Sequence, residues 1–243
     1  FGAIGQGAFS DYVVLDERAV QMKPSNLTFE QAAAFQTAYL TAYVSLVRRG
    51  ELTKGETLLV HGSTGGVGMA AVQLGKYLGA TVIATGTSEE KLKYTKSWGA
   101  DHTILTHKEG KVEFREEVKD LTDGKGADVI YDPVGGDVFD HSIRCINWGG
   151  RLLIVGFASG RIPTLPVNMA LIKGFSVIGV RAGEYGRKNP LAGKENNEAI
   201  REICASGHFD PYICKVFNLN EAKEAIHYLS ERKLIGKVVI RTD

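Results

Sequence analysis

A glycine-rich segment holds the residues best suited to bind a phosphate group, and it reads Ser63-Thr64-Gly65-Gly66-Val67-Gly68. Ser63 replaces the first glycine of a GxGxxG pattern. Gly65 would let the backbone approach a pyrophosphate, and Gly68 would let a helix pack closely on a strand. The amides of Gly65, Gly66 and Val67 would point at the phosphates, where the helix dipole favours negative charge. An apolar run before the segment and a helix-forming run after it predict a dinucleotide-binding loop.

The end of the next apolar run, 81–85, indicates which dinucleotide is bound. Folds that prefer NAD(H) usually carry an acidic residue there for the ribose hydroxyls, and this chain has Gly86. The missing carboxylate removes repulsion against a 2′-phosphate, which Ser88 and Lys91 could reach from the next helix. The alternative is that this stretch is only a solvated first helical turn. The pattern favours NADP(H).

Other phosphate-binding families fit these residues less well. A P-loop needs Lys and then Ser or Thr after its glycines, and Gly68 is followed by Met69. Short-chain reductases need a Tyr-x-x-x-Lys pair, and no tyrosine here has a lysine four residues later. A methyltransferase would want an acidic residue where Gly86 stands. A merely structural glycine-rich turn is the remaining alternative.

Strand and helix patterns alternate from Thr57 onward, and they predict the elements that position these residues. Such alternation is typical of an α/β fold with a doubly wound parallel sheet. The expected strands are 57–61, 81–85, 102–105, 127–131, 150–155 and 175–180. The expected helices are 67–79, 88–98, 111–121, 137–147 and 168–173.

The two ends of the chain follow other patterns. Thr28 and Gln31 form the signature of a capping box, which predicts a helix running to about Arg49. Residues 8–15 have the pattern of a strand-rich region. Phe1 begins the chain without an initiator methionine or a signal-peptide pattern, so a fragment is expected. The tail should leave the sheet and pack on the N-terminal part, with helix 191–206, strand 212–217, helix 220–231 capped by Asn220, and strand 237–241.

Composition places few limits on function. The net charge of +1 gives no electrostatic reason to expect a nucleic acid or an anionic membrane as partner. No apolar run approaches the roughly 20 residues of a membrane span. Cys145, Cys204 and Cys214 are far apart and form no CxxC motif. Free thiols predict a reducing compartment, and we expect a cytoplasmic location.

Six segments match one known family in order along the chain. They are 7–12, 32–42, 62–68, 131–137, 149–160 and 235–239. Together they resemble the zinc-independent quinone oxidoreductases of the medium-chain dehydrogenase/reductase superfamily. Such proteins join a Rossmann domain to a GroES-like, β-rich catalytic domain, of which this chain would hold a remnant. The resemblance implies catalytic-domain residues at 1–36 and 182–243, and an NADP(H)-binding domain at 37–181.

The resemblance also implies roles for individual residues. Thr41 would contact the nicotinamide end of the cofactor, and Thr106 would lie near the adenosine. The region around Gly236 would close over the cofactor. Two strand ends would line the nicotinamide, and they contribute Val155, Gly156, Phe157, Ile178, Gly179 and Val180.

The implied activity is hydride transfer from NADPH to a quinone or an α,β-unsaturated carbonyl. No residue stands out as a proton donor, so the catalytic residues are unassigned. Tyr39, Arg181 and Tyr185 are candidates to line the acceptor site, although Tyr39 could instead be a helix-packing aromatic. The alternatives are an enoyl reductase acting on acyl thioesters, a non-catalytic NADPH-binding protein of the crystallin kind, and a fragment that binds cofactor without turnover.

No metal is expected. Zinc-bearing relatives place a cysteine ligand where this chain has Ala33, and its six histidines show no ligand spacing. Catalytic zinc needs about three protein ligands.

The strand expected at 175–180 is apolar and should be the outer strand of the sheet. An exposed apolar edge invites pairing. In relatives this edge pairs with its two-fold mate, which implies a homodimer. The alternative is that the tail covers the edge.

Overall fold

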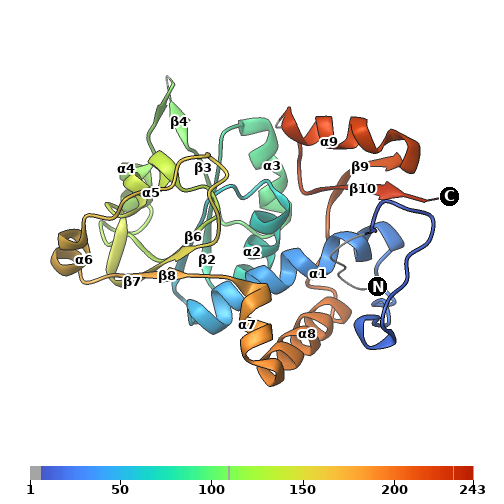
Figure 1. The fold of residues 1–243 in the computed structure, drawn as a ribbon. Coiled ribbons are helices and arrows are strands. Elements are labelled where there is room, and N and C mark those ends of the chain that lie inside the picture. The colour runs from blue at the N-terminus through green and yellow to red at the C-terminus, as the bar shows by residue number, and fades with distance from the viewer. Residues whose placement is uncertain (1–6, 109, 232, 243) are drawn as a thin grey trace.

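Six parallel strands form the central sheet of the structure, a computed structural model that describes residues 7–108, 110–231 and 233–242 (Figure 1). Their order is β3-β2-β1-β6-β7-β8, so the chain starts in the middle and winds to one edge and then to the other. This is the Rossmann order, and it confirms the predicted doubly wound α/β fold. The strands are β1 (Thr57–Val60), β2 (Thr81–Gly86), β3 (His102–Leu105), β6 (Ala127–Asp132), β7 (Ile146–Ile154) and β8 (Ser176–Gly179).

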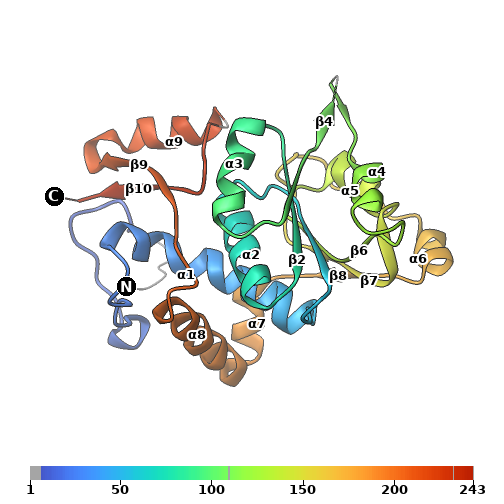
Figure 2. The same ribbon diagram turned by 180° about the vertical axis from the view of Figure 1, so that it is seen from behind.

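The side chains of each inner strand alternate between two hydrophobic cores. In β1, Leu58 and Val60 belong to one core and Leu59 to the other. Both faces are buried because helices cover both sides of a parallel sheet. On one side lie α2 (Gly66–Tyr77) and α3 (Glu89–Ser97), and on the other lie α4 (Arg115–Asp120) and α5 (Gly136–Ser142) (Figures 1 and 2).

The first long helix, α1 (Phe29–Tyr43), begins at the predicted capping box. The Gln31 amide donates to the Thr28 hydroxyl, and the Thr28 amide donates to the Gln31 side chain. Beyond Tyr43 the helix continues as a π-helical segment, η2 (Val44–Arg49), so the predicted end near Arg49 is confirmed. Helix α1 packs against α2 and thereby links the start of the chain to the sheet.

The C-terminal part leaves the sheet after β8 and packs on α1, which contacts α8, β9 and β10. The predicted Asn220 cap is wrong, because Asn218 and Glu221 form the capping box across a short helix. A helix at 182–188 was also not predicted. The elements are α6 (Val167–Lys173) before β8, then α7 (Ala182–Lys188), α8 (Pro190–Ala205), β9 (Ile213–Asn218), η3 (Leu219–Glu221), α9 (Ala222–Ser230) and β10 (Lys237–Arg241), with β9 and β10 parallel.

Two helices are shorter than predicted because strand pairing takes some of their residues. In the first, predicted at 111–121, β5 (Lys111–Val112) pairs antiparallel with β4 (His107–Lys108), and α4 starts only at Arg115. In the second, predicted at 137–147, α5 ends at Ser142. Ile146 already pairs with Ala127 of β6 at the start of β7.

The prediction of a strand-rich region at 8–15 is wrong, because the structure has no strand there. A strand is defined by pairing with a neighbour, and no described segment pairs with these residues. Tyr12 and Val14 are almost fully exposed. A short 3₁₀ helix, η1 (Glu17–Ala19), follows.

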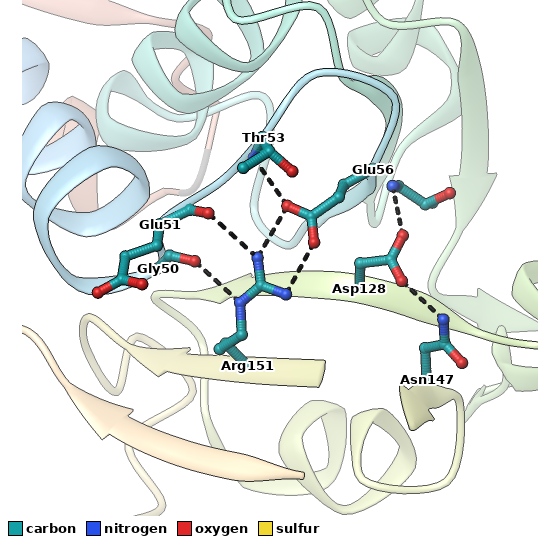
Figure 3. A network of polar contacts seen from close by, with 8 residues as sticks. Gly50, Glu51, Thr53, Glu56, Asp128, Asn147 and Arg151 are labelled. Carbon is teal, nitrogen blue, oxygen red and sulfur yellow. Dashed lines mark hydrogen bonds and ion pairs between the residues drawn. The ribbon is translucent and has the colours of Figure 1, made fainter. Parts of the chain in front are cut away.

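A polar network joins the strands at the edge where β1 and β6 begin (Figure 3). The Arg151 guanidinium on β7 donates to both Glu56 carboxylate oxygens at 2.8 Å and to the Gly50 carbonyl at 2.9 Å. Asp128 accepts from the Thr57 amide at 2.8 Å and from the Asn147 side chain at 2.6 Å. Burial alone raises the pKa of Glu56, but the bonds from Arg151 and the Thr53 amide lower it overall.

Candidate dinucleotide-binding site

The glycine-rich loop joins β1 to α2 near the middle of the sheet. The chain turns at Gly62, whose φ of 56° favours glycine. Gly68 packs so tightly on this turn that a Cβ would lie 2.2 Å from the Gly62 carbonyl oxygen. Only glycine fits such an approach, which agrees with the packing role expected of Gly68. The loop lies between β1 and β6, where the winding direction of the sheet reverses and α/β folds bind ligands.

The amides that open α2 face no capping side chain. Gly65 is the N-cap residue and has no side chain to accept from the first helical turn. Its own amide donates to the Gly62 carbonyl at 3.0 Å, so it is not the free donor expected from the sequence. Gly66 and Val67 are the first two helical residues, and their amides have no intrahelical acceptor. The Gly66 and Val67 amides are therefore suited to bind an anion.

Ser63 and Thr64 hold the loop in place rather than presenting their hydroxyls to a ligand. The Ser63 hydroxyl is buried and donates to the Thr85 carbonyl at 2.9 Å, and its amide donates to the same oxygen. The Thr64 carbonyl accepts the Gly236 amide at 2.8 Å. The loop is therefore tied to β2 on one side and to the segment before β10 on the other.

The buried side chain of His61 supports the glycine-rich loop. Its ring is fully buried, with Nδ1 2.8 Å from the Thr85 hydroxyl and Nε2 2.8 Å from the Ser142 hydroxyl. Ser142 donates its proton to the Val138 carbonyl, so the imidazole donates from Nε2 and accepts at Nδ1. Burial lowers the pKa of His61 to about 3. The ring is neutral and links β1, β2 and α5.

A cleft of about 810 Å³ opens beside the glycine-rich loop. Its wall comes from the segments that follow β1, β2, β6 and β7, together with the end of α9. Among the residues predicted to bind cofactor, Thr64, Gly65 and Lys91 line it. The other lining residues include Gly62, Thr87, Val134, Gly135, Gly136, Ala158, Ser159, Leu229 and Leu234.

At one end of the cleft the structure brings Lys91 to the segment that follows α9. Ser88 caps α3 and accepts from the Lys91 amide at 3.4 Å. The Lys91 ammonium donates to the Leu234 carbonyl at 3.2 Å, and burial lowers its pKa. Gly86 brings no side chain to the end of β2, and its carbonyl accepts both the amide and the hydroxyl of Thr106. Thr106 is buried and supports Gly86 instead of lining the cleft.

The ends of β6 and β7 meet on the other side of the cleft. The Asp132 carbonyl accepts the amides of Val155 and Gly156, and its carboxylate accepts those of Val134 and Gly135 at 2.8 Å. Burial raises the pKa of Asp132 although these amides lower it. The second carboxylate oxygen is buried with no partner in the described part of the chain.

The residues predicted to line the nicotinamide lie on two neighbouring strand ends. Phe157 is exposed and touches the position where Gly135 lacks a side chain. Ile178 and Val180 are partly buried and Gly179 is exposed at the end of β8. The Val180 amide donates to the Ile154 carbonyl at 2.9 Å, which holds the two strand ends together.

Tyr39 is not at an open site. Its ring is fully buried between Phe35 and Phe209, and its hydroxyl donates to the Gln73 side chain at 2.8 Å. Burial raises its pKa well above the usual value. The prediction that Tyr39 lines the acceptor site is therefore wrong, because the face of α1 that carries it packs on α2.

The remaining predicted residues do not line the cleft. The Thr41 hydroxyl donates to the Thr37 carbonyl of its own helix at 2.7 Å. Arg181 is exposed at the start of α7, and Tyr185 is partly buried within that helix. Neither is among the residues that line the 810 Å³ cleft.

Sequence reasoning did not assign Asp132 to this site, nor did it place Lys237, whose side chain lies across Gly66 at the start of α2. Asp132 was part of a matching segment, but its bonds to amides need the fold of the β6–α5 turn. Lys237 follows Gly236, which was noted only as part of a closing region. The sequence signal that could have identified Lys237 is the glycine–lysine pair at the start of the last strand.

No three side chains of His, Cys, Asp or Glu converge as metal ligands anywhere in the described residues. Ala33 lies exposed on α1 and offers no ligand atom. The absence of zinc from the protein stays a prediction.

The sheet order and the glycine-rich turn define a Rossmann-type dinucleotide-binding fold. Residues 66–201 match the family described as zinc-binding dehydrogenase. The quinone oxidoreductase-like protein 2 homolog of Nematostella vectensis is 38% identical over 99% of this chain and 66% of its own length. The chain belongs to the quinone oxidoreductase type of the medium-chain dehydrogenase/reductase superfamily. It spans about two thirds of the length of that relative.

Three solved structures have the same fold, and the cofactors named for them include both NAD and NADPH. A quinone oxidoreductase of Pseudomonas syringae pv. Tomato DC3000 has a TM-score of 0.85 at 31% identity, covering 99% of this chain and 73% of that one. An NAD-dependent alcohol dehydrogenase has a TM-score of 0.85 at 35% identity, covering 98% and 66%. Mycobacterial Rv1454c, solved with NADPH, has a TM-score of 0.82 at 28% identity, covering 89% and 66%. The family is one of oxidoreductases.

Proposed function

We propose that this chain is part of an NADPH-dependent oxidoreductase that reduces a quinone or an α,β-unsaturated carbonyl without zinc. One observation carries the proposal. Gly65, the N-cap residue of the uncapped helix α2, and Lys91 line the same cleft, and Gly86 brings no carboxylate to the end of β2. A dinucleotide that carries both a pyrophosphate and a 2′-phosphate matches this pair of anion sites.

The residues present fit such a cofactor. Gly65 leaves room for the backbone to approach a pyrophosphate, which the Gly66 and Val67 amides would bind. Lys91 and Ser88 would hold the 2′-phosphate as a point charge and a hydroxyl. Bound NADPH supplies a hydride at its nicotinamide ring. The ends of β7 and β8, including Val155, would position that ring and exclude water.

Two further parts of the proposal concern the whole protein. Cys145, Cys204 and Cys214 are free thiols, which supports a reducing, cytoplasmic compartment. No helix within the described residues is long and apolar enough to cross a membrane.

The outer strand β8 has no neighbour on its far side among the described strands, and this supports a homodimer through residues 175–180.

Titration with NADPH and NADH, followed by nicotinamide fluorescence, tests the cofactor assignment. We expect NADPH to bind at least about tenfold more tightly, and Lys91→Ala to remove this preference because it removes the charge beside the 2′-phosphate. Lys125→Ala, at an exposed lysine after α4, is the matched control. Equal affinity of the unaltered protein for both nucleotides would contradict the assignment.

The acceptor is tested by screening quinones, enones and a 2-enoyl thioester for NADPH oxidation. The quinone and enone assignments predict turnover with the first two classes. Turnover of the thioester alone would identify an enoyl reductase. Binding of NADPH with no turnover of any class would favour a non-catalytic nucleotide-binding role for this chain.

A further inference from the structure

A second cavity, of about 580 Å³, lies where α1, α7 and α8 pack together (Figures 1 and 2). No described residue lines both this cavity and the 810 Å³ cleft, so the two are separate. Gly186 of α7 and Gly193 of α8 both line it, and a Cβ added to Gly193 would lie 3.0 Å from the Gly186 Cα. The close crossing of these two helices brings side chains from both to one hollow.

The side chain of Asn196 on α8 is only 1% exposed and lines this cavity. Its orientation is fixed, because Oδ1 accepts from the Arg48 Nε at 2.7 Å and a guanidinium nitrogen can only donate. The other end of the amide is therefore the NH₂ group. Its Nδ2 atom is buried and has no acceptor among the described residues. A buried donor without an acceptor costs free energy, which an acceptor on a bound molecule would recover.

The charged residues that line the cavity are mainly cationic. Arg201 of α8 is partly buried, and no described residue forms an ion pair or a hydrogen bond with its guanidinium. Arg187 pairs with Glu184 at 2.8 Å, and the Lys194 ammonium lies 3.9 Å from the Glu198 carboxylate. Since Glu198 is the one acidic residue among the described residues that line the cavity, the lining carries a net positive charge.

The unsatisfied groups define the chemistry of a ligand. The NH₂ group of Asn196 and the guanidinium of Arg201 can only donate hydrogen bonds. A guanidinium is best matched by the paired oxygens of a carboxylate or a phosphate. Leu40, Ala182 and Pro190 add apolar surface for the carbon part of the same molecule. We propose that this cavity binds a small organic anion, whose carboxylate or phosphate group is held by Asn196 and Arg201.

The acceptor of the proposed reaction or a separate small molecule can carry this anionic group. The cavity begins close to the residues proposed to position the nicotinamide, because Ala182 follows Val180 by two residues and Leu40 directly precedes Thr41. An acceptor with an anionic end could therefore reach it. The acceptor as source rests on the proposed function, whereas the anion site itself does not.

Isothermal titration calorimetry with inorganic phosphate tests the site, in an excess of NADPH that occupies the other cleft and again without nucleotide. We expect Arg201→Met to raise the Kd for phosphate at least about tenfold, because a charge-assisted bond is lost. Arg201→Lys should recover part of the affinity, since it keeps the charge but not the paired donors. Arg144→Met, at an exposed arginine after α5, is the matched control and should bind as the unaltered protein does.

Asn196→Asp provides a second test. It keeps the oxygen that accepts from Arg48 and replaces the NH₂ group by a carboxylate oxygen, which repels an anion. We expect the Kd for phosphate to rise at least about tenfold, while thermal unfolding shows that the variant still folds. A purely structural role of Asn196 predicts unchanged phosphate affinity. If this variant does not fold, Arg201→Met decides alone, because its side chain is only partly buried.

The outcomes separate the anion site from the proposed function. No binding of phosphate to the unaltered protein, or an affinity that neither substitution changes, would overturn the site. If the site stands and phosphate raises the KM for the acceptor in the unaltered protein but not in Arg201→Met, the acceptor carries the anionic group. Turnover that phosphate leaves unchanged would instead assign the site to a separate molecule. If no acceptor is turned over, the proposed function fails and the phosphate titration still decides the anion site.

Discussion

At the scale of single residues, His61 is a polar side chain whose function is structural. Its ring is satisfied by the hydroxyls of Thr85 and Ser142 and lies against Phe114. Because the unprotonated Nδ1 accepts a hydrogen bond from the Thr85 hydroxyl, a proton added at Nδ1 would break that bond. The histidine beside the glycine-rich loop therefore supports the loop in its neutral form.

This geometry predicts a pH dependence of stability. The pKa of His61 is about 3 in the folded protein, against 6.5 for an ordinary histidine. Between these values the unfolded chain binds more protons, so the free energy of unfolding falls as the pH decreases from about 6.5 toward 3. The loss due to His61 is up to about 1.4 kcal/mol per pH unit. Urea unfolding at several pH values measures it.

The contribution of His61 is isolated by comparison with His61→Asn, whose pH dependence should be shallower. His227→Gln, at a largely exposed histidine of α9, should keep the steeper dependence of the unaltered protein. Equal slopes for all three proteins would show that protonation of His61 does not limit stability in acid.

At the scale of elements, Arg151 joins parts of the chain that the sheet alone does not connect. It holds Glu56, before β1, and the Gly50 carbonyl, after η2, against the middle of β7 (Figure 3). Both side chains of the ion pair are about one fifth exposed. A bidentate pair with so little solvent contact is stronger than an exposed one. It fixes the amino ends of the strands, away from the candidate binding site.

We therefore expect Arg151→Met to lower the free energy of unfolding by about 2–3 kcal/mol, because it leaves the Glu56 carboxylate partly buried and without its main partner. Affinity for NADPH should be unchanged, since the network lies at the opposite edge of the sheet. Chemical denaturation and the fluorescence titration measure the two quantities.

The double variant Arg151→Met with Glu56→Gln serves as the control. Its loss of stability should be smaller than the sum of the two single losses, because the stranded carboxylate is also gone. Additive losses would mean that the two side chains act independently. Arg187→Met, on an exposed arginine of α7, should change stability little.

At the scale of the whole molecule, the open edge of the sheet bears on assembly. Strand β8 is the last in the sheet order, and no described part of the tail pairs with it. Val177 on this strand is about one third exposed. Trp148 and Leu171 add exposed apolar area on neighbouring elements. Such an edge supports the proposed homodimer.

The predicted homodimer should have twice the chain mass of 26.4 kDa when measured by light scattering after size-exclusion chromatography. Val177→Lys should shift it toward the monomer, because a charged side chain on an edge strand opposes pairing. Ile226→Lys, at an exposed apolar residue of α9, should leave the mass unchanged. A monomeric mass for the unaltered protein at micromolar concentration would refute the proposed interface.

Local patterns in the sequence determined much of the architecture. The alternation of strands and helices predicted the parallel sheet, and Thr28 with Gln31 predicted the start of α1, because period and capping depend on residues close in sequence. The packing of Gly68 on the loop also follows from the strand–loop–helix context. These features need few distant contacts, so the chain order alone was enough to predict them.

Tertiary structure decided what depends on neighbours distant in sequence. Pairing with β4 and with β6 took residues from two predicted helices, and packing on α2 put Tyr39 into the core. The Ser63 hydroxyl donates to the Thr85 carbonyl, so it is not presented to a ligand. Lys237 reached the start of α2 only because β10 folds back onto the glycine-rich loop. Side-chain direction and burial follow from these long-range contacts, and no local pattern contains them.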